Sequence, residues 1–221
     1  MSVSVLVTSD FALAPAIEAD WLAQLPAARR GEIGRWPDTR ARQRSLLGSR
    51  LLAEGLRRLG YPASALSTLR YAPRSKPTLG VPVDFSLSHC EGRVVCALST
   101  RGAVGIDVER LEGLQAGEFQ LYLSAAERAW AGCSARRFYT LWTRKEAVAK
   151  AAGRRGLRDV ARVDTMPSRH DAAFEGRLWR TPVVAVGRHH VAHLALADEA
   201  REITISRLEP QTFAEAAHAA R

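Results

Sequence analysis

The sequence predicts an α+β fold of two similar halves, each with a small antiparallel sheet and one long helix. Two long amphipathic stretches, at 39–60 and 134–153, stand among short apolar runs of the kind that form strands. A similar order of strands and a long helix returns after residue 100. The chain has 221 residues, enough for two halves of about a hundred residues each. We therefore divide it into residues 1–101 and 102–221.

The first half opens with a Val-rich alternating run at 2–9, which predicts a strand. Residues 14–33 are helical in pattern but are interrupted by Pro26. Residues 39–60 predict a long amphipathic helix, because leucines gather on one side and Gly60 follows as a stop signal. Two strand-like runs, "FSLSH" and "VVCALST", come next and are joined by "CEGR".

The second half begins with a predicted strand at 104–109. A helical segment, "SAAERAWAGC", and the long helix at 134–153 follow, and Gly153 ends that helix. Four further strands are expected, in "DVARVDT", "AFEGRLWR", "HHVAHLALAD" and "EITISRLE".

The composition is that of an ordinary globular protein, with 47% apolar and 25% charged residues. We expect a cytoplasmic protein without a membrane partner, because the chain shows no signal-peptide pattern and no run near the roughly 18 apolar residues that span a bilayer. The three cysteines, Cys90, Cys96 and Cys133, form no CxxC pair and read as free thiols in a reducing compartment.

The charge pattern is more informative than the composition. The net charge is +9, yet only three of the 32 basic residues are lysines: Lys76, Lys145 and Lys150. In so Arg-rich a chain, a retained lysine indicates a site that needs a compact, strongly hydrated ammonium group.

Two carboxylates lie close together in the strand at 104–109. Residues i and i+2 of a strand share a face, so Asp107 and Glu109 project together while Ile106 and Val108 point to the core. Two like charges at that spacing repel unless a cation lies between them. The simpler interpretation is that both face water at a strand end.

The helix at 134–153 adds to this group, since Trp142, Glu146 and Lys150 follow one helical face at i, i+4 and i+8. Alone, Glu146 and Lys150 would be an ordinary surface ion pair and Trp142 a core anchor. Together with the acidic strand they make three carboxylates and a lysine. Mg²⁺ is usually held by such carboxylates, with substrate phosphates and waters completing the octahedron.

"GIDVER", followed by "LWTRKEAVAKAAGRRGL", resembles the 4′-phosphopantetheinyl transferases of the Sfp type, which have a G(I/V)D(I/V)E strand and a WxxKEAxxK helix. "RSKPTL" and "FSLSHC" are similar to the basic G-K-P segment and the F-N-(I/V)-S-H-S strand of that family. "LPAARRGEIGRW" and "ARQRSLLGSRLL" are similar to its N-terminal region. The resemblance covers roughly residues 20–157 and implies the family's pseudo-twofold fold, with coenzyme A in the cleft between the halves.

The resemblance also implies the activity. Such enzymes transfer 4′-phosphopantetheine from coenzyme A to a serine hydroxyl of an apo acyl or peptidyl carrier protein and release 3′,5′-ADP. It implies that Asp107, Glu109 and Glu146 hold Mg²⁺, and that Glu146 accepts the serine proton directly or through a metal-bound water. Lys150 would neutralise the pyrophosphate and the departing ADP. We expect a monomer, and the pathway of the carrier stays open.

For the phosphates and nucleotide of coenzyme A, the resemblance implies a basic set in the first half: Arg29, Arg44, Ser45, Lys76, Ser88 and His89. Arg44 and Ser45 are preferred over Arg40. Ser88 and His89 would face opposite sides of a regular strand, so we expect both to reach a ligand only at its frayed end. Lys145 lies off the face of Glu146 and Lys150, and is either structural or touches the cofactor from the side.

Three residues depart from the family pattern. Glu32 stands where relatives often carry Lys, so that Arg29 or Arg30 must compensate. Thr78 replaces the aromatic residue that often follows the K-P pair, and Cys90 replaces a serine after the histidine. None of the three touches the predicted metal ligands or Lys150, so activity remains the expectation.

Two rival functions are a basic nucleic-acid-binding protein and an inactive homologue that binds coenzyme A. The first is disfavoured because the arginines are scattered and aromatic residues do not alternate with them. The second is disfavoured because all three carboxylates and Lys150 are present. A zinc site at His189, His190 and His193 is also disfavoured, since His190 and His193 face opposite sides of a strand.

Overall fold

The computed structural model describes residues 2–72, 75–113, 120–166, 168, 170–197 and 202–209. The helices in these ranges are α1 (Pro15–Ala23), α2 (Ala27–Gly34), α3 (Thr39–Arg58), α4 (Ala125–Ala131), α5 (Ala135–Ala151) and α6 (Leu157–Arg162), with short 3₁₀ segments at Ala63–Thr68 and Gln120–Tyr122. The strands are β1 (Ser2–Thr8), β2 (Asp84–Cys90), β3 (Arg93–Ser99), β4 (Val104–Arg110), β5 (Asp171–Phe174), β6 (Arg177–Arg180), β7 (His190–Leu196) and β8 (Glu202–Arg207).

The strands form two four-stranded sheets, in the orders β2-β3-β1-β8 and β4-β7-β6-β5. This mixture of helices with two small sheets confirms the predicted α+β class. The second sheet is antiparallel throughout. The first is mixed, because β8 runs parallel to β1, with Val3 opposite Ile203. A strand from the last residues described thus completes the sheet of the first half.

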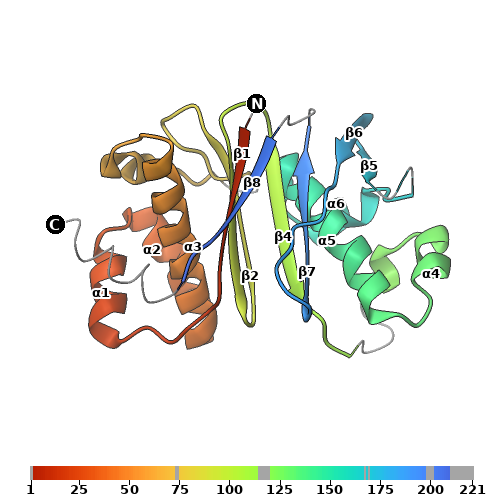
Figure 1. Ribbon diagram of the computed structural model, residues 1–221, viewed down its shortest axis with the longest axis horizontal. Coiled ribbons are helices and arrows are strands. Elements are labelled where there is room, and N and C mark those ends of the chain that lie inside the picture. Colours follow the sequence, from red (N-terminus) through yellow and green to blue (C-terminus); the bar gives the residue numbers. More distant parts are fainter. Residues whose placement is uncertain are drawn as a thin grey trace.

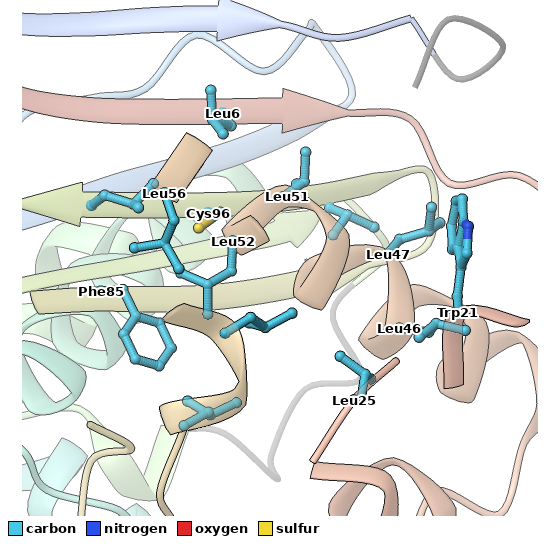
Figure 2. Close-up of a cluster of buried hydrophobic side chains, with 14 of the residues drawn as sticks. Leu6, Trp21, Leu25, Leu46, Leu47, Leu51, Leu52, Leu56, Phe85 and Cys96 are labelled. Carbon is cyan, nitrogen blue, oxygen red and sulfur yellow. The ribbon is translucent and has the colours of Figure 1, made fainter. Parts of the chain in front are cut away.

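The two sheets face each other and the two long helices cover their outer faces (Figure 1). The alternation along β1 reflects this arrangement. Val3, Val5 and Val7 pack toward the second sheet in one core cluster with Ile106 and Val108. Leu6 points the other way, into the cluster that the leucines of α3 form with Trp21 and Phe85 (Figure 2). The leucines that make residues 39–60 amphipathic are thus the side chains by which α3 packs on the first sheet.

The approach of α5 to β4 places the predicted site residues. Gly105 lies on β4 where a Cβ atom would come within 1.9 Å of the carbonyl oxygen of Ala147. Only glycine fits there, so the helix that carries Glu146 and Lys150 packs directly on the strand that carries Asp107.

The edge strands β2 and β4, one from each sheet, are linked by side chains rather than by a backbone ladder. The amide of Val104 donates to Asp84 Oδ2 at 2.8 Å, and the amide of Ile106 donates to Ser86 Oγ at 3.1 Å. These bonds hold the two halves side by side along the strands that carry Ser88 and Asp107.

Most predicted elements are confirmed, but the strand predicted in "DVARVDT" is wrong. Residues 157–162 form α6, with the side chain of Val160 buried against the same cluster as Leu141. Leu157, Val160 and Val163 recur every three residues, a helical spacing that a short window hides.

The run "AFEGRLWR" is a hairpin of β5 and β6 that turns at Glu175–Gly176, where both residues have positive φ. Among the residues described, no helix is both long and apolar enough to cross a membrane.

Candidate active site

A cavity of about 510 Å³ is lined by residues of both halves. All the predicted site residues except Arg44 line it: Arg29, Ser45, Lys76, Ser88, His89, Asp107, Glu109, Glu146 and Lys150. The side chains come from α2, α3, the segment before β2, β2 itself, β4 and α5. The fold therefore gathers residues that are separated by up to 121 positions in the chain.

The centre of the cavity is a contact between β4, β2 and α5. Lys150 donates to Asp107 Oδ1 at 2.6 Å, and the hydroxyl of Ser88 donates to the same oxygen at 2.8 Å. Lys150 also lies 3.2 Å from Ser88 Oγ. Burial alone would lower the pKa of the Lys150 ammonium, but the charges of Asp107 and Glu146 outweigh it and raise that pKa above its ordinary value. Lys150 is therefore a fixed positive charge in the cavity.

The other two carboxylates are held in an environment that disfavours their charge. Burial, followed by the nearby charge of Asp107, raises the pKa of Glu109 to about 8, although Trp142 donates a hydrogen bond to this carboxylate. Burial also raises the pKa of Glu146, with Asp107 adding to the shift and Lys150 opposing it. An additional cation in this part of the cavity would relieve the repulsion among the three carboxylates.

The carboxylates of the cavity determine whether it could hold a metal ion. Among the described residues, no three Asp, Glu, His or Cys side chains converge closely enough to hold an ion as they stand. The donor set nevertheless fits a hard cation, because Asp107, Glu109 and Glu146 offer only carboxylate oxygens. Asp107 Oδ2 is moreover buried without a hydrogen-bond partner, a costly state that a cation would satisfy. The residues fit Mg²⁺ in chemistry.

The basic part of the cavity begins at Arg29 on α2. Its side chain is buried, donating from Nε to Ser49 Oγ at 2.8 Å and from Nη2 to the carbonyl oxygen and Oγ of Ser45 at 2.7 and 3.0 Å. Ser45 therefore contacts Arg29 as well as lining the cavity. Lys76 donates to the Val104 carbonyl at 2.6 Å and pairs with Asp84, so its ammonium also links the two halves.

Ser88 and His89 both line the cavity, but not through a frayed strand end as expected. Pairing between β2 and β3 continues past them to Cys90. Five consecutive residues, Phe85 to His89, line the cavity, and their strand β2 is the edge strand of the first sheet that lies beside β4. His89 makes an edge contact with Trp36, with ring centroids 5.3 Å apart. Burial, with the charges of Arg44, Lys150 and Arg29, lowers the pKa of His89 to about 4, so the imidazole is neutral at physiological pH.

Two predicted basic residues lie elsewhere. Arg44 is not among the residues that line the cavity, and its guanidinium lies 3.3 Å from Asp10 and 3.8 Å from Asp38. Lys145 is fully buried on the far side of α5, 3.0 Å from Glu127 Oε2. Lys145 therefore has a structural role and does not contact the cavity from the side.

The departures from the family pattern have local consequences. Glu32 lines the cavity and pairs with Arg35, while Arg30 is exposed and donates to the Leu25 carbonyl. Of the two arginines expected to compensate for Glu32, only Arg29 faces the cavity. Burial raises the pKa of the Cys90 thiol to about 12, so that it stays protonated.

Several lining residues were not predicted from the sequence: Trp36, Tyr71, Arg154, Arg155 and Val160. A usable signal existed for the two arginines, because they follow Lys150 closely in the chain, just after α5 ends at Ala151. The three-histidine alternative gains no support. His193 bonds to Thr143 Oγ1 at 2.7 Å, whereas His190 contacts the carbonyl of Glu91 at 2.9 Å.

Comparison with known proteins gives one consistent result. Residues 103–205 match the model of the 4′-phosphopantetheinyl transferase superfamily. The chain is 33% identical over 156 residues to the 4′-phosphopantetheinyl transferase AcpT of Salmonella typhi. The aligned region covers 66% of this chain and 75% of AcpT. It is 30% identical over 125 residues to the 4′-phosphopantetheinyl transferase gsp of Aneurinibacillus migulanus, covering 54% of this chain and 52% of the relative. The chain thus spans about half the length of the latter protein.

Proposed function

This chain belongs to the 4′-phosphopantetheinyl transferase superfamily, and from that premise we propose that it transfers 4′-phosphopantetheine from coenzyme A to a serine hydroxyl of an apo carrier protein. The second product is 3′,5′-ADP. The observation that carries the proposal is one cavity in which Asp107, Glu109, Glu146 and Lys150 lie beside the basic residues Arg29 and Lys76.

We assign the metal ligands from the chemistry of the donors. Asp107, Glu109 and Glu146 would hold Mg²⁺, and Asp107 Oδ2 is the oxygen most clearly available for it. When bound, Mg²⁺ supplies charge neutralisation at the pyrophosphate oxygens during phosphoryl transfer.

The remaining steps use side chains of the protein. The serine oxygen attacks the phosphorus next to pantetheine, and the bond from that phosphorus to the bridging oxygen of the pyrophosphate breaks. Glu146 accepts the serine proton, a role favoured by its raised pKa. The broken bond leaves negative charge on the departing 3′,5′-ADP, and Lys150 donates hydrogen bonds to it from the fixed position beside Asp107.

The partner that suits this protein is acidic. A net charge of +9 speeds the approach of a negatively charged carrier protein at low ionic strength.

We propose that the enzyme acts as a monomer in the cytoplasm, consistent with three free cysteines.

The decisive experiment mixes the purified protein with Mg²⁺, coenzyme A and a panel of apo carrier proteins. Intact mass spectrometry should show one carrier gaining the mass of a single phosphopantetheine group. Omission of coenzyme A and replacement of the acceptor serine by alanine are the controls. If no carrier gains mass while the protein binds coenzyme A tightly, the inactive homologue is the better description. Retention on DNA that coenzyme A does not compete would favour the nucleic-acid-binding rival.

A further inference from the structure

We propose that Ser86 is a positioning residue for the transfer reaction, because its hydroxyl fixes the backbone of β4 next to Asp107 and so places that carboxylate. The inference rests on the proposed function, since its effect is read in the turnover of transfer. Ser86 belongs to the run "FSLSHC" but was not among the predicted site residues. It acts through Asp107 and takes no chemical part in the reaction.

One face of β2 is polar and is turned toward β4. Asp84, Ser86 and Ser88 alternate along the strand and share this face, whereas Phe85 and Leu87 pack in the core of the first half. All three polar side chains bond to β4, the first two to backbone amides and the third to a carboxylate. Strand β4 thus receives side-chain atoms where a neighbouring strand would normally supply backbone carbonyls.

The bond that Ser86 accepts lies directly beside Asp107. Its Oγ accepts from the amide of Ile106 at 3.1 Å, and Asp107 is the next residue of β4. Two positions further along the same face of β2, Ser88 donates to Asp107 Oδ1 at 2.8 Å. Two successive polar side chains of β2 therefore hold this carboxylate, one through the backbone before it and the other through its oxygen.

Burial makes the bond to Ile106 difficult to replace. Ser86 is only 5% exposed and Ile106 is fully buried, so water has little access to the amide if the hydroxyl is removed. An unsatisfied buried amide is costly, and β4 would shift toward another acceptor. The tight packing of Gly105 against α5 resists movement on that side of the strand. The shift would therefore be taken up on the side of β2, where Asp107 meets Ser88.

A small displacement of Asp107 matters because both of its oxygens depend on position. Oδ1 holds the ammonium of Lys150 at 2.6 Å, and Oδ2 is the buried oxygen that we assign to the metal ion. A misplacement of about 1 Å at a reacting centre can cost about 100-fold in rate. The basic residues that line the rest of the cavity do not depend on this bond. Loss of the Ser86 hydroxyl should therefore lower kcat and leave the affinity for coenzyme A nearly constant.

The test compares the wild type with Ser86→Ala, Ser86→Thr and the control Ser99→Ala. Threonine keeps the hydroxyl, so Ser86→Thr should recover most of the turnover that Ser86→Ala loses. Ser99 is also a buried serine of the first sheet, but its hydroxyl bonds to the backbone of Arg101 and it does not line the cavity. Carrier mass spectrometry gives kcat, and isothermal titration calorimetry gives the dissociation constant of coenzyme A. Amide hydrogen exchange followed by NMR reports the bond at Ile106 directly.

The expected result is a split between turnover and binding. Ser86→Ala should lose about 10- to 100-fold in kcat, while the dissociation constant of coenzyme A changes less than about threefold. The Ile106 amide should exchange about tenfold faster or more, as expected for the loss of one buried hydrogen bond. Ser99→Ala should keep the kcat of the wild type.

The outcomes separate this inference from the proposed function. If the wild type transfers phosphopantetheine and Ser86→Ala keeps its kcat, or if exchange at Ile106 is unchanged, the positioning role is wrong and the transferase assignment stands. An equal loss of kcat in Ser99→Ala would show a general effect of destabilisation and would also overturn the role. Weaker binding of coenzyme A at unchanged kcat would mean that Ser86 contacts the ligand instead. A wild type that modifies no carrier would overturn the proposed function and this role with it.

Discussion

The ammonium of Lys150 lies 2.6 Å from Oδ1 of Asp107, while Oδ2 of the same carboxylate is buried without a hydrogen-bond partner. Lys150 comes from α5 and Asp107 from β4, so the contact joins the two elements that carry the proposed chemistry. One carboxylate oxygen thus fixes the lysine and the other remains available to a cation.

Replacement of Lys150 by alanine should reduce turnover more than it reduces binding of coenzyme A. The ammonium is placed to stabilise charge that develops on the leaving 3′,5′-ADP, and removal of one such donor typically costs about 100-fold or more in kcat. Steady-state transfer kinetics and calorimetric titration of coenzyme A give the two quantities. A variant that lost affinity with unchanged kcat would contradict the role assigned to Lys150.

Replacement of Glu146 by glutamine should abolish transfer and leave the fold intact. Glutamine preserves the size of the side chain but cannot accept the serine proton or hold a metal ion as a carboxylate does, so a loss of about 100-fold or more is expected. Carrier mass spectrometry measures the transfer, and circular dichroism with thermal melting checks the fold. Wild-type turnover in Glu146→Gln would remove this residue from the mechanism.

Replacement of Gly105 by alanine should damage both stability and activity. The new Cβ would lie 1.9 Å from the Ala147 carbonyl oxygen and 2.7 Å from the Ala151 amide nitrogen, so α5 would have to move away from β4. The control is Gly48→Ala in α3, where the nearest atom would be at an ordinary 3.7 Å. Because alanine favours a helix over glycine by about 0.5–1 kcal/mol, Gly48→Ala should be neutral or stabilising in urea denaturation. Similar effects of the two substitutions would contradict the tight packing of β4 and α5.

Replacement of Lys145 by methionine should destabilise the protein strongly. Glu127 and Lys145 are completely buried, and the substitution leaves the Glu127 carboxylate without its counter-ion, which typically costs about 3–5 kcal/mol. The double variant Lys145→Met/Glu127→Gln should recover part of the loss, because it leaves no unpaired buried charge. The one amide oxygen can still accept from Thr165, although the bond from the Ser124 amide to the other oxygen is lost. Denaturant unfolding gives the free energies. An additive double variant would show that the two residues do not interact.

The elements that were predicted best are those whose pattern is local. Strand β4 and helix α5 each carry their own periodicity, so the shared positions of Glu146 and Lys150 and of Asp107 and Glu109 followed from spacing alone. The mixed pairing of β1 with β8 depends on contacts between the two ends of the described chain, and no local pattern reports it. The helix α6 was missed because its six residues are too few to distinguish a helical spacing from a strand.

The residues of the cavity divide in the same way. Ser88 and Asp107 were predicted from motifs on single elements, and the structure brings them to 2.8 Å. Tyr71 and Arg155 were missed because they belong to different halves, and only the packing of the halves brings both to the lining of one cavity. Arg44 follows a motif in the sequence, yet the nearby carboxylates of Asp10 and Asp38 engage its guanidinium. At Arg44, the tertiary contacts outweighed the motif in the sequence.

Replacement of His193 by glutamine should make the protein less sensitive to acid. Burial, followed by the charge of Arg144, lowers the pKa of His193 to about 3, whereas an unfolded histidine titrates near 6.5. Between these values the unfolded chain binds more protons, so the free energy of unfolding falls as the pH drops below about 6.5, by up to roughly 1.4 kcal/mol per pH unit for this residue. Urea denaturation at several pH values between 7.5 and 5 should show a shallower fall in His193→Gln, with part of the slope remaining because His89 has a pKa of about 4. The exposed His170→Gln variant is the control and should follow the wild type. An unchanged slope in His193→Gln would mean that this imidazole does not contribute to acid unfolding.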